Sequence, residues 1–124
     1  MNSKISEKKN ILKRLLVLKN ETNMEVTAEI LRMFSERQSD YELKMKNYIL
    51  HNDFENIKFL AHNLKSTSAN IGAVRLPQIC QWVEDSNPDN RLLPFYLRSM
   101  FSEYKKTKYF ANEIMDQLSG AAVQ

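Results

Sequence analysis

One histidine of this sequence has neighbours that could take part in chemistry with it. His62 is followed three residues later by Lys65, and small side chains follow at Ser66 and Ala69. Residues three apart on a helix lie side by side, so the lysine ammonium would lie next to the imidazole. A neutral imidazole is a competent nucleophile because its unperturbed pKa is about 6.5, and an adjacent ammonium stabilises negative charge on a transferred group. These residue types at this spacing therefore fit a site in which His62 accepts a phosphoryl group. The alternative is a surface histidine beside a surface lysine.

The helix that would carry His62 has a well-defined apolar face. At about 100° per residue, one side of this helix gathers Ile57, Leu60, Ala61, Leu64, Ser68 and Ile71. His62 falls on roughly the opposite side, so we expect it in solvent, with Ser66 and Ala69 leaving room for another protein. Phe59 also points away from the core on this wheel, and Leu31 on the outer side of an earlier helix would extend the docking patch. The alternative for Phe59 is a ring folded against a neighbouring helix.

The rest of the chain predicts an all-α scaffold. Two glycines and three prolines in 124 residues allow few turns, which favours a few long helices. The expected fold is an antiparallel four-helix up-down bundle with an additional short N-terminal covering helix. The apolar spacing predicts helices over residues 10–18, 22–51, 53–71, 74–85 and 91–118, with 35–40 as the weakest part of the second. We expect a linker or frayed helix start over residues 1–9, one domain over 10–118, and a frayed tail over 119–124.

Charge and cysteine content narrow the class of protein. The formal net charge of +3 is mild and concentrated near the start, which is weaker than the bias of most nucleic-acid-binding domains. A single cysteine, Cys80, cannot form an internal disulfide, and no apolar run approaches the roughly 20 residues that span a bilayer. We therefore expect a cytoplasmic domain with Cys80 in its core. An open alternative is a basic adaptor that binds nucleic acid or a membrane surface through residues 4–19. His51 and His62, without a nearby cysteine or acidic cluster, make a weak zinc site, so we expect no metal.

The stretch LAHNLKSTSANIGA, residues 60–73, resembles the signature of histidine-containing phosphotransfer (HPt) domains, which reads roughly A-H-x-L-K-G-S-x-x-x-x-G-A. The resemblance spans roughly residues 11–118. It implies a phosphorelay intermediate, in which His62 takes a phosphoryl group from an aspartate of one receiver domain and passes it to a response-regulator aspartate. Lys65 would stabilise the phosphoryl group. Glu84 on the next helix would accept a hydrogen bond from Nδ1–H and leave Nε2 as the nucleophile, unless it is a plain surface residue.

The resemblance also implies the partners and the absence of a cofactor. The receivers would bring Mg²⁺ and the acidic pocket, whereas this chain has no glycine-rich phosphate loop and hence no ATP site of a known kind. We expect a phosphocarrier, not an enzyme, that works as a monomer with receiver domains and a hybrid sensor histidine kinase and binds no nucleic acid. Ser66 replaces the glycine usual after the lysine, which we expect to change partner preference. The alternative is a helical interaction or inhibitor domain that binds a receiver or kinase without being phosphorylated.

Overall fold

The computed structural model describes residues 3–37 and 40–120. These residues form six α-helices and a terminal π-helical turn, and they contain no strand, so the all-α class is confirmed. The elements are α1 (Ser3–Glu21), α2 (Met24–Arg37), α3 (Tyr41–Leu50), α4 (Phe54–Asn70), α5 (Arg75–Asp85), α6 (Leu93–Met115) and η1 (Asp116–Gly120). None of the helices in this part of the chain has the length and apolar character needed to cross a membrane.

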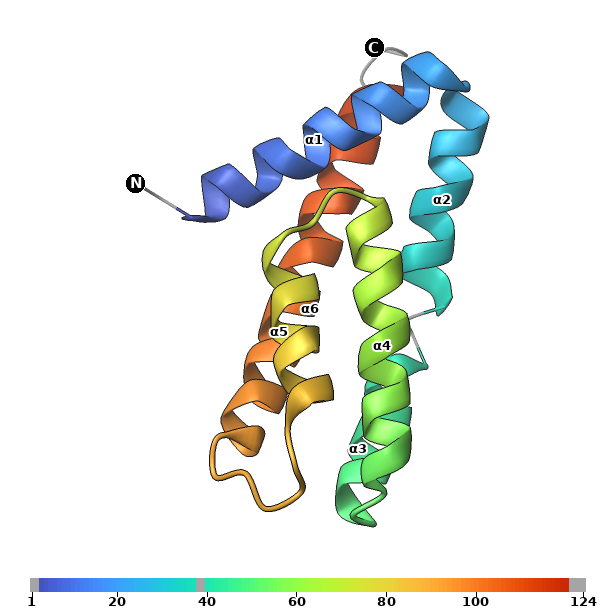
Figure 1. The fold of residues 1–124 in the computed structure, drawn as a ribbon. Helices are drawn as coiled ribbons and strands as arrows, with labels where there is room; N and C mark the ends of the chain where they lie inside the picture. Colours follow the sequence, from blue (N-terminus) through green and yellow to red (C-terminus); the bar gives the residue numbers. More distant parts are fainter. Residues whose placement is uncertain (1–2, 38–39, 121–124) are drawn as a thin grey trace.

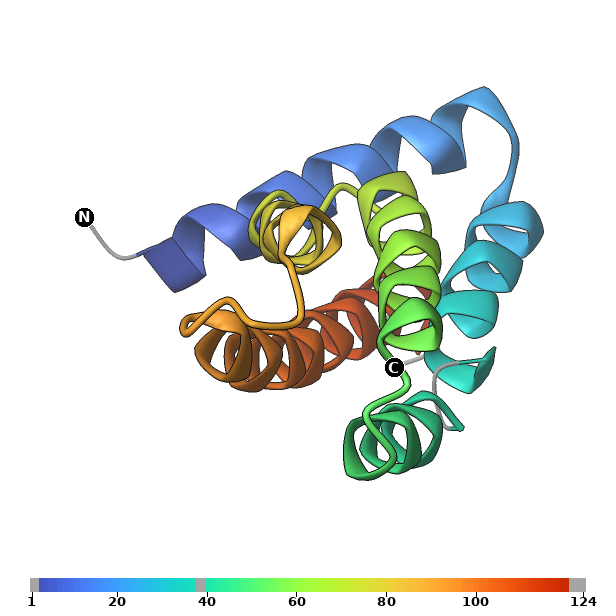
Figure 2. The ribbon, with the colours of Figure 1, turned by 60° about the horizontal axis from the view of Figure 1, so that its bottom comes forward.

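The helices pack in an order that follows the sequence. α2 and α3 run one after the other along one side, α4 returns beside them, and α5 and α6 follow (Figure 1). The most extensive contact is between α4 and α5, and the next is between α5 and α6. α1 lies across the ends of α4 and α5, where the turn between them meets it (Figures 1 and 2). α4 and α5 thus form one face of the molecule.

A single apolar core joins all six helices. α1 contributes Ile11 and Leu15, both fully buried, and α4 contributes Leu64. In the middle of the core the ring of Tyr104 packs against two further aromatic rings, those of Phe34 and Tyr41, each with centroids 5.8 Å away. Burial of each large apolar side chain stabilises the fold by about 1.5–3 kcal/mol. The core therefore holds α4 in place through the buried face of this helix and leaves its other face exposed.

The N-terminal helix is longer than the sequence indicated. A linker or a frayed helix start was expected over residues 1–9; residues 3–9 form the first turns of α1, and residues 1–2 lie outside the described residues. Glu7 is only 2% exposed. Its carboxylate accepts hydrogen bonds from the backbone N–H groups of Val74 at 2.8 Å and Arg75 at 3.1 Å. The first amides of a helix have no intrahelical partner, so Glu7 caps α5 from α1.

The prediction of a single helix over residues 22–51 is wrong, because two helices occupy this segment. α2 ends at Arg37 and α3 begins at Tyr41, with residues 38–39 outside the described residues. The segment 35–40, Ser-Glu-Arg-Gln-Ser-Asp, offers no apolar side chain to the core, and its serine and aspartate residues compete with the helix by local hydrogen bonding. The N-terminus of α2 is capped by Asn23, whose Oδ1 accepts the N–H of Val26 at 2.9 Å.

The boundaries of the later helices lie close to those expected. Asp53 caps α4 as predicted, since its side chain accepts the N–H of Asn56 at 3.4 Å. α6 begins at Leu93, two residues after the expected start. Of the tail expected to fray over residues 119–124, residues 119 and 120 belong to η1, and residues 121–124 lie outside the described part of the chain.

Candidate functional site

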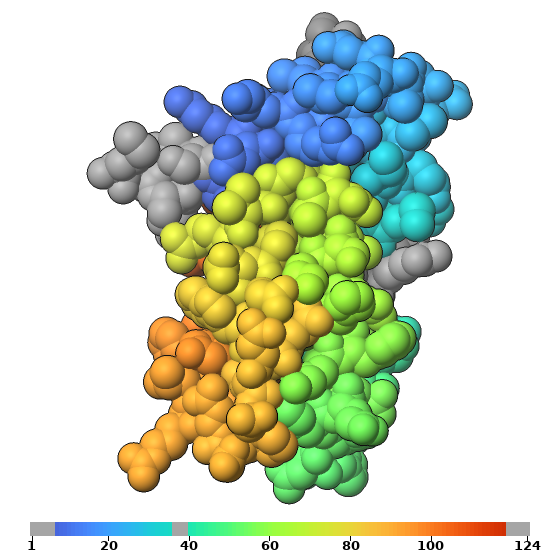
Figure 3. Space-filling model, viewed as in Figure 1, coloured from blue at the N-terminus to red at the C-terminus, as the bar shows by residue number. Residues whose placement is uncertain are grey.

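The helix that carries the candidate site is fixed in the molecule along one face. α4 buries Ile57, Ala61, Leu64 and Ser68. The hydroxyl of Ser68 donates to the backbone carbonyl of Leu64 at 2.6 Å, which satisfies this buried polar group within the helix. The opposite face of α4 is therefore presented to solvent, beside α5 on the same side of the molecule (Figure 3).

His62 lies on that exposed face, and its side chain is 57% exposed. Its Nδ1 is 2.9 Å from Oε2 of Glu84, which projects from α5. The other carboxylate oxygen of Glu84, Oε1, forms an ion pair with Nζ of Lys65 at 2.7 Å. One carboxylate therefore joins His62 and Lys65, and the structure brings together the three residues that the sequence selected.

The environment of Glu84 keeps this carboxylate charged. Its side chain is only 19% exposed. Burial alone would raise the pKa of Glu84, but hydrogen bonds and charge interactions with Lys65 and His62 outweigh that effect and lower the pKa below its usual value. A carboxylate at this place accepts a hydrogen bond from Nδ1–H and so selects the tautomer of His62 in which Nε2 carries no proton. In that tautomer the lone pair of Nε2 is free, and Nε2 is the ring nitrogen that does not contact Glu84.

Gln81 belongs to the same site, and our reading of the sequence missed it. Lys65 Nζ donates to Gln81 Oε1 at 2.8 Å, and Gln81 Nε2 donates to Asp85 Oδ1 at 2.9 Å. Gln81 precedes Glu84 by three residues, so both side chains lie on the same side of α5. That spacing is the signal that could have identified Gln81. Lys65 is held by two side chains of α5 and is 27% exposed.

The predicted docking residues divide into two groups. Phe59 is 61% exposed, and Ser66 and Ala69 are also exposed on α4. Leu31 was placed on the outer side of its helix, and this is wrong because it is only 3% exposed. The buried stripe of α2 passes through Thr27, Leu31 and Phe34, because α2 packs against both α1 and α6. Leu31 is a core residue and takes no part in a docking surface.

Two other residues weighed for chemistry have ordinary structural roles. Cys80 is buried in the core, and burial raises the pKa of its thiol to about 12, which leaves it protonated and unreactive. His51 is exposed, with Nδ1 2.8 Å from the backbone carbonyl of Asn47. Over residues 3–37 and 40–120, no group of three or more His, Cys, Asp or Glu side chains is arranged to hold a metal ion.

The fold and this site define a small helical domain that presents a histidine, held by a carboxylate and flanked by a lysine, on an open surface. The sequence matches the model of the family described as Hpt domain over residues 29–107, which is more than half of the chain. The protein therefore belongs to the Hpt domain family, whose members are phosphocarrier modules of phosphorelay signalling and interact with receiver domains and histidine kinases. Neither a search of curated proteins nor a search of solved structures found a match.

Proposed function

We propose that His62 accepts a phosphoryl group from the phosphoaspartate of one receiver domain and passes it to the aspartate of a response regulator. The observation that supports this most strongly is the 2.9 Å contact between His62 Nδ1 and Glu84 Oε2, made by an imidazole that is otherwise open to solvent. A buried histidine could not meet an aspartate on another protein, and an unoriented one would present Nε2 only part of the time. His62 combines access with orientation.

The chemistry follows from that geometry. The Nε2 lone pair attacks the phosphorus atom of the aspartyl phosphate, the N–P bond forms as the O–P bond breaks, and the aspartate carboxylate leaves with the bonding electrons. The imidazole becomes cationic, and the carboxylate of Glu84 balances its charge while holding Nδ1–H. No proton has to leave His62, so transfer to the next aspartate is the same step in reverse. The Mg²⁺ that assists both steps belongs to the receiver, and this chain supplies only the imidazole and its neighbours.

Lys65 has the second role in this proposal. Its ammonium lies at the same carboxylate as the imidazole, 2.7 Å from Glu84 Oε1. A phosphoryl group on Nε2 carries about two negative charges, so part of the lysine charge can move from Glu84 to the phosphoryl oxygens. Phe59, Ser66 and Ala69 form the surface on which a receiver docks, with the small side chains allowing its aspartate to approach.

We further propose that one chain is sufficient and that it works in the cytoplasm, because the phosphoryl group of such a relay originates from ATP. His62, Lys65, Gln81 and Glu84 all come from the same chain, which supports a monomeric carrier.

We regard α2 and α3 as one broken helix of an antiparallel four-helix up-down bundle that α1 covers. The contacts between α3 and α4, α4 and α5, and α5 and α6 support this arrangement.

The test is transfer from a phosphorylated receiver. The protein is incubated with a receiver carrying radiolabelled phosphoaspartate and Mg²⁺, and the label on the protein is followed over time. We expect acid-labile, base-stable label that is absent in His62→Gln and unchanged in His51→Gln, which removes the other histidine. Label on the His62→Gln protein would overturn the proposal.

An interaction or inhibitor domain would behave differently in the same experiment. Such a domain would bind the receiver without taking up label, and its binding would survive His62→Gln. The exposed ring of Phe59 fits both functions, so binding alone cannot separate them. Label on His62 does.

A further inference from the structure

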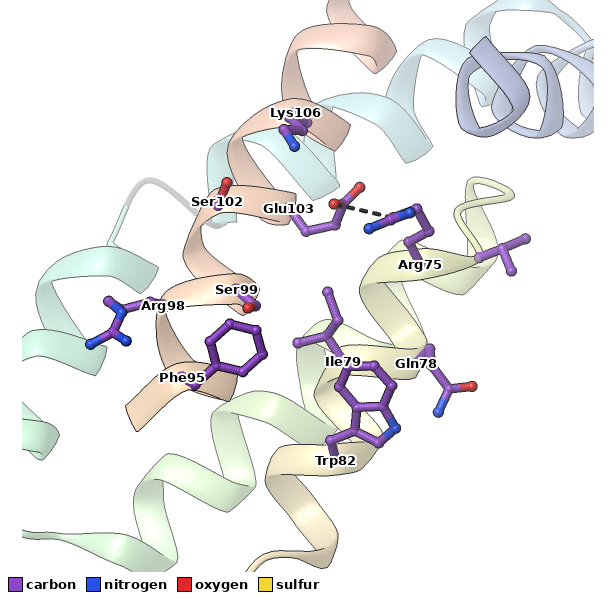
Figure 4. Close-up of a pocket in the computed structure, with 11 residues that line it drawn as sticks. Arg75, Gln78, Ile79, Trp82, Phe95, Arg98, Ser99, Ser102, Glu103 and Lys106 are labelled. Carbon is purple, nitrogen blue, oxygen red and sulfur yellow. Dashed lines mark ion pairs between the residues drawn. The ribbon is translucent and has the colours of Figure 1, made fainter. Parts of the chain in front are cut away.

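A groove runs between α5 and α6, away from His62, and has a volume of about 770 Å³. Figure 4 shows Trp82 and Phe95 toward one end, Ile79 near the middle, and Lys106 at the other end. The groove is open to solvent: Trp82 is 41% exposed and Phe95 is 53% exposed. Farther along it, Arg75, Gln78 and Ser102 are exposed as well. A drug-sized ligand usually has most of its surface enclosed by its pocket, so an open groove between two helices better fits a segment of another protein.

The aromatic end is pre-arranged for contact. Tyr96 packs against both exposed rings, with its centroid 5.5 Å from that of Trp82 and 6.2 Å from that of Phe95. Aromatic side chains that are already held by their neighbours lose little conformational freedom on binding, and they are the usual anchors of protein interfaces. This end of the groove is therefore suited to bind apolar side chains of a partner.

The other end of the groove is basic. The side chain of Glu103 is only 6% exposed. Its Oε1 lies 3.4 Å from Nε of Arg75, so these two charges offset each other (Figure 4). Lys106 lines the groove beyond them without an ion pair among the described residues. The charged residues that line the groove are three basic ones, Arg75, Arg98 and Lys106, and one acidic one, Glu103. The net positive field favours an acidic occupant.

The groove and the phosphotransfer site use different sides of α5. Arg75, Ile79 and Trp82 recur at steps of three and four and line the groove, whereas Glu84 lies nine residues after Arg75. At about 100° per residue, nine residues place two side chains on opposite sides of a helix. A protein bound in the groove would therefore leave His62 open to a receiver.

We propose that an amphipathic helix of a partner protein docks in this groove. This helix has acidic residues on both flanks of its apolar stripe. The stretch of α6 from Phe95 to Lys106 is about 16 Å long at the α-helical rise, which matches roughly three turns of a bound helix. Apolar residues at i, i+4 and i+7 of that helix would contact Trp82, Ile79 and Phe95, and its carboxylates would lie near Lys106. The docked helix tethers the partner while His62 exchanges its phosphoryl group elsewhere, so the partner's own receiver acts at a raised effective concentration.

The chain provides its own probe for this proposal, because Trp82 is its single tryptophan and lies in the groove. Two synthetic helical peptides without tryptophan are titrated while Trp82 emission is recorded. Both carry leucines at i, i+4 and i+7, one with glutamates on its flanks and the other with lysines at the same positions. We expect a saturable shift with the acidic peptide, and binding of the basic peptide weaker by about tenfold or more. No saturable shift, or equal binding of the two peptides, would overturn the proposal.

Matched variants locate the contact. We expect Lys106→Glu to weaken the acidic peptide by roughly five- to tenfold and Phe95→Ser to weaken it at least as much. Lys46→Glu and Leu43→Ser, on the exposed surface of α3, should leave the affinity unchanged. Loss of affinity in the α3 variants to the same degree would contradict the assignment. Circular dichroism confirms that each variant is folded, and the two-peptide comparison on the parent protein does not depend on any variant.

Two further arms separate this inference from its rivals. His62→Gln should bind the acidic peptide as the parent does, so failure of the groove and failure of phosphotransfer are distinguishable. Vesicles of phosphatidylglycerol test a membrane as the occupant. If they shift Trp82 emission and Lys106→Glu abolishes that shift, the groove binds an anionic membrane and the proposal of a protein helix is wrong.

Discussion

Glu84 and His62 meet across the contact between α4 and α5, with Oε2 of the carboxylate 2.9 Å from Nδ1 of the imidazole. The two residues are 22 positions apart in the sequence, and the turn at Gly72 brings them together. The pair holds the histidine in one orientation and keeps a negative charge beside the ring, which would balance the positive charge of the imidazolium in the proposed phosphorylation of His62.

Replacing Glu84 should slow phosphorylation of His62 without unfolding the domain. We expect Glu84→Ala to reduce the initial rate of label transfer by about tenfold or more, because the ring loses both its orientation and the balancing charge. Glu84→Gln keeps an acceptor oxygen for Nδ1–H and should retain more of the rate. Asp89→Ala, in the exposed loop between α5 and α6, is the matched control. Equal rates for the parent and Glu84→Ala would show that Glu84 does not act on His62.

The lowered pKa of Glu84 also predicts how stability depends on pH. A carboxyl group with a lower pKa in the folded than in the unfolded protein stabilises the fold above its unfolded pKa, and this stabilisation is lost as the pH falls through its folded pKa. The usual value for this group is 4.5 and the folded value lies below it. We therefore expect the free energy of unfolding of the parent to exceed that of Glu84→Gln near pH 7, with the difference shrinking as the pH falls below about 4. Urea unfolding of both proteins from pH 7 to pH 3 measures this, and a difference that grows on acidification would contradict it.

Lys65 should affect phosphotransfer more than stability. Its ammonium contacts Glu84 and Gln81, and each contact lies near the surface, where ion pairs contribute little to folding. We expect Lys65→Ala to lower the initial rate of label transfer by about tenfold, with Lys65→Arg intermediate and Lys46→Ala unchanged. Gln81→Ala should lower the rate by only about twofold, because Lys65 keeps its pair with Glu84. A loss of folding stability in Lys65→Ala large enough to explain the slower transfer would show that the residue is structural.

Only the part of the site on α4 could be predicted from residue spacing, because His62 and Lys65 lie on one regular helix. His62, Lys65 and the buried face of α4 follow from helical periodicity alone, and Glu84 came from the resemblance to HPt domains. The position of Leu31 was predicted wrongly, because periodicity does not show which side of a helix its neighbours cover. Val26 and Met33 are apolar and at helical spacing, yet they are 39% and 38% exposed, while Thr27 is fully buried. Which side of α2 is covered depends on where α1 and α6 pack against it, and that is a tertiary relationship.

The beginning of α1 shows the same limit. Apart from Ile5, residues 3–9 are polar or charged, which is typical of a linker. The partner of Glu7 is the backbone at the start of α5, more than 60 residues later. No local pattern marks a carboxylate that caps a distant helix. In the same way, Gln81 is an ordinary surface residue until the turn at Gly72 places α5 against Lys65. Contacts between helices that are far apart in sequence are what the sequence left undetermined.

The cap that Glu7 forms should be measurable as stability. Glu7→Ala leaves the N–H groups of Val74 and Arg75 without their acceptor and removes a favourable charge at the N-terminus of α5. We expect a loss of about 1–3 kcal/mol in the free energy of unfolding. Glu21→Ala makes the same substitution at the exposed end of α1 and should change stability by less than about 0.5 kcal/mol. Chemical unfolding followed by circular dichroism compares the two, and equal losses would show that the cap contributes nothing specific.

Gly72 fixes the crossing of α1 over the turn between α4 and α5. Its φ is +93°, a conformation that side chains other than glycine rarely adopt, and an added Cβ would lie 2.5 Å from Arg14 Cβ and 2.8 Å from the carbonyl oxygen of Asn10. Both neighbours belong to the body of α1, so neither can move aside without moving the helix. We expect Gly72→Ala to lower the free energy of unfolding by about 2–4 kcal/mol, from backbone strain together with overpacking.

A double-mutant cycle separates these two causes. Arg14→Gly removes the nearest atom, so Gly72→Ala should destabilise an Arg14→Gly protein less than it destabilises the parent. The part that remains is the backbone strain at φ +93° and the contact with Asn10. Because α5 begins three residues after Gly72, a shift of α1 would also disturb the Glu7 cap, and Glu7→Ala should lose part of its effect in the Gly72→Ala protein. Equal effects of Gly72→Ala with and without Arg14 would mean that the close approach of α1 is not what requires glycine here.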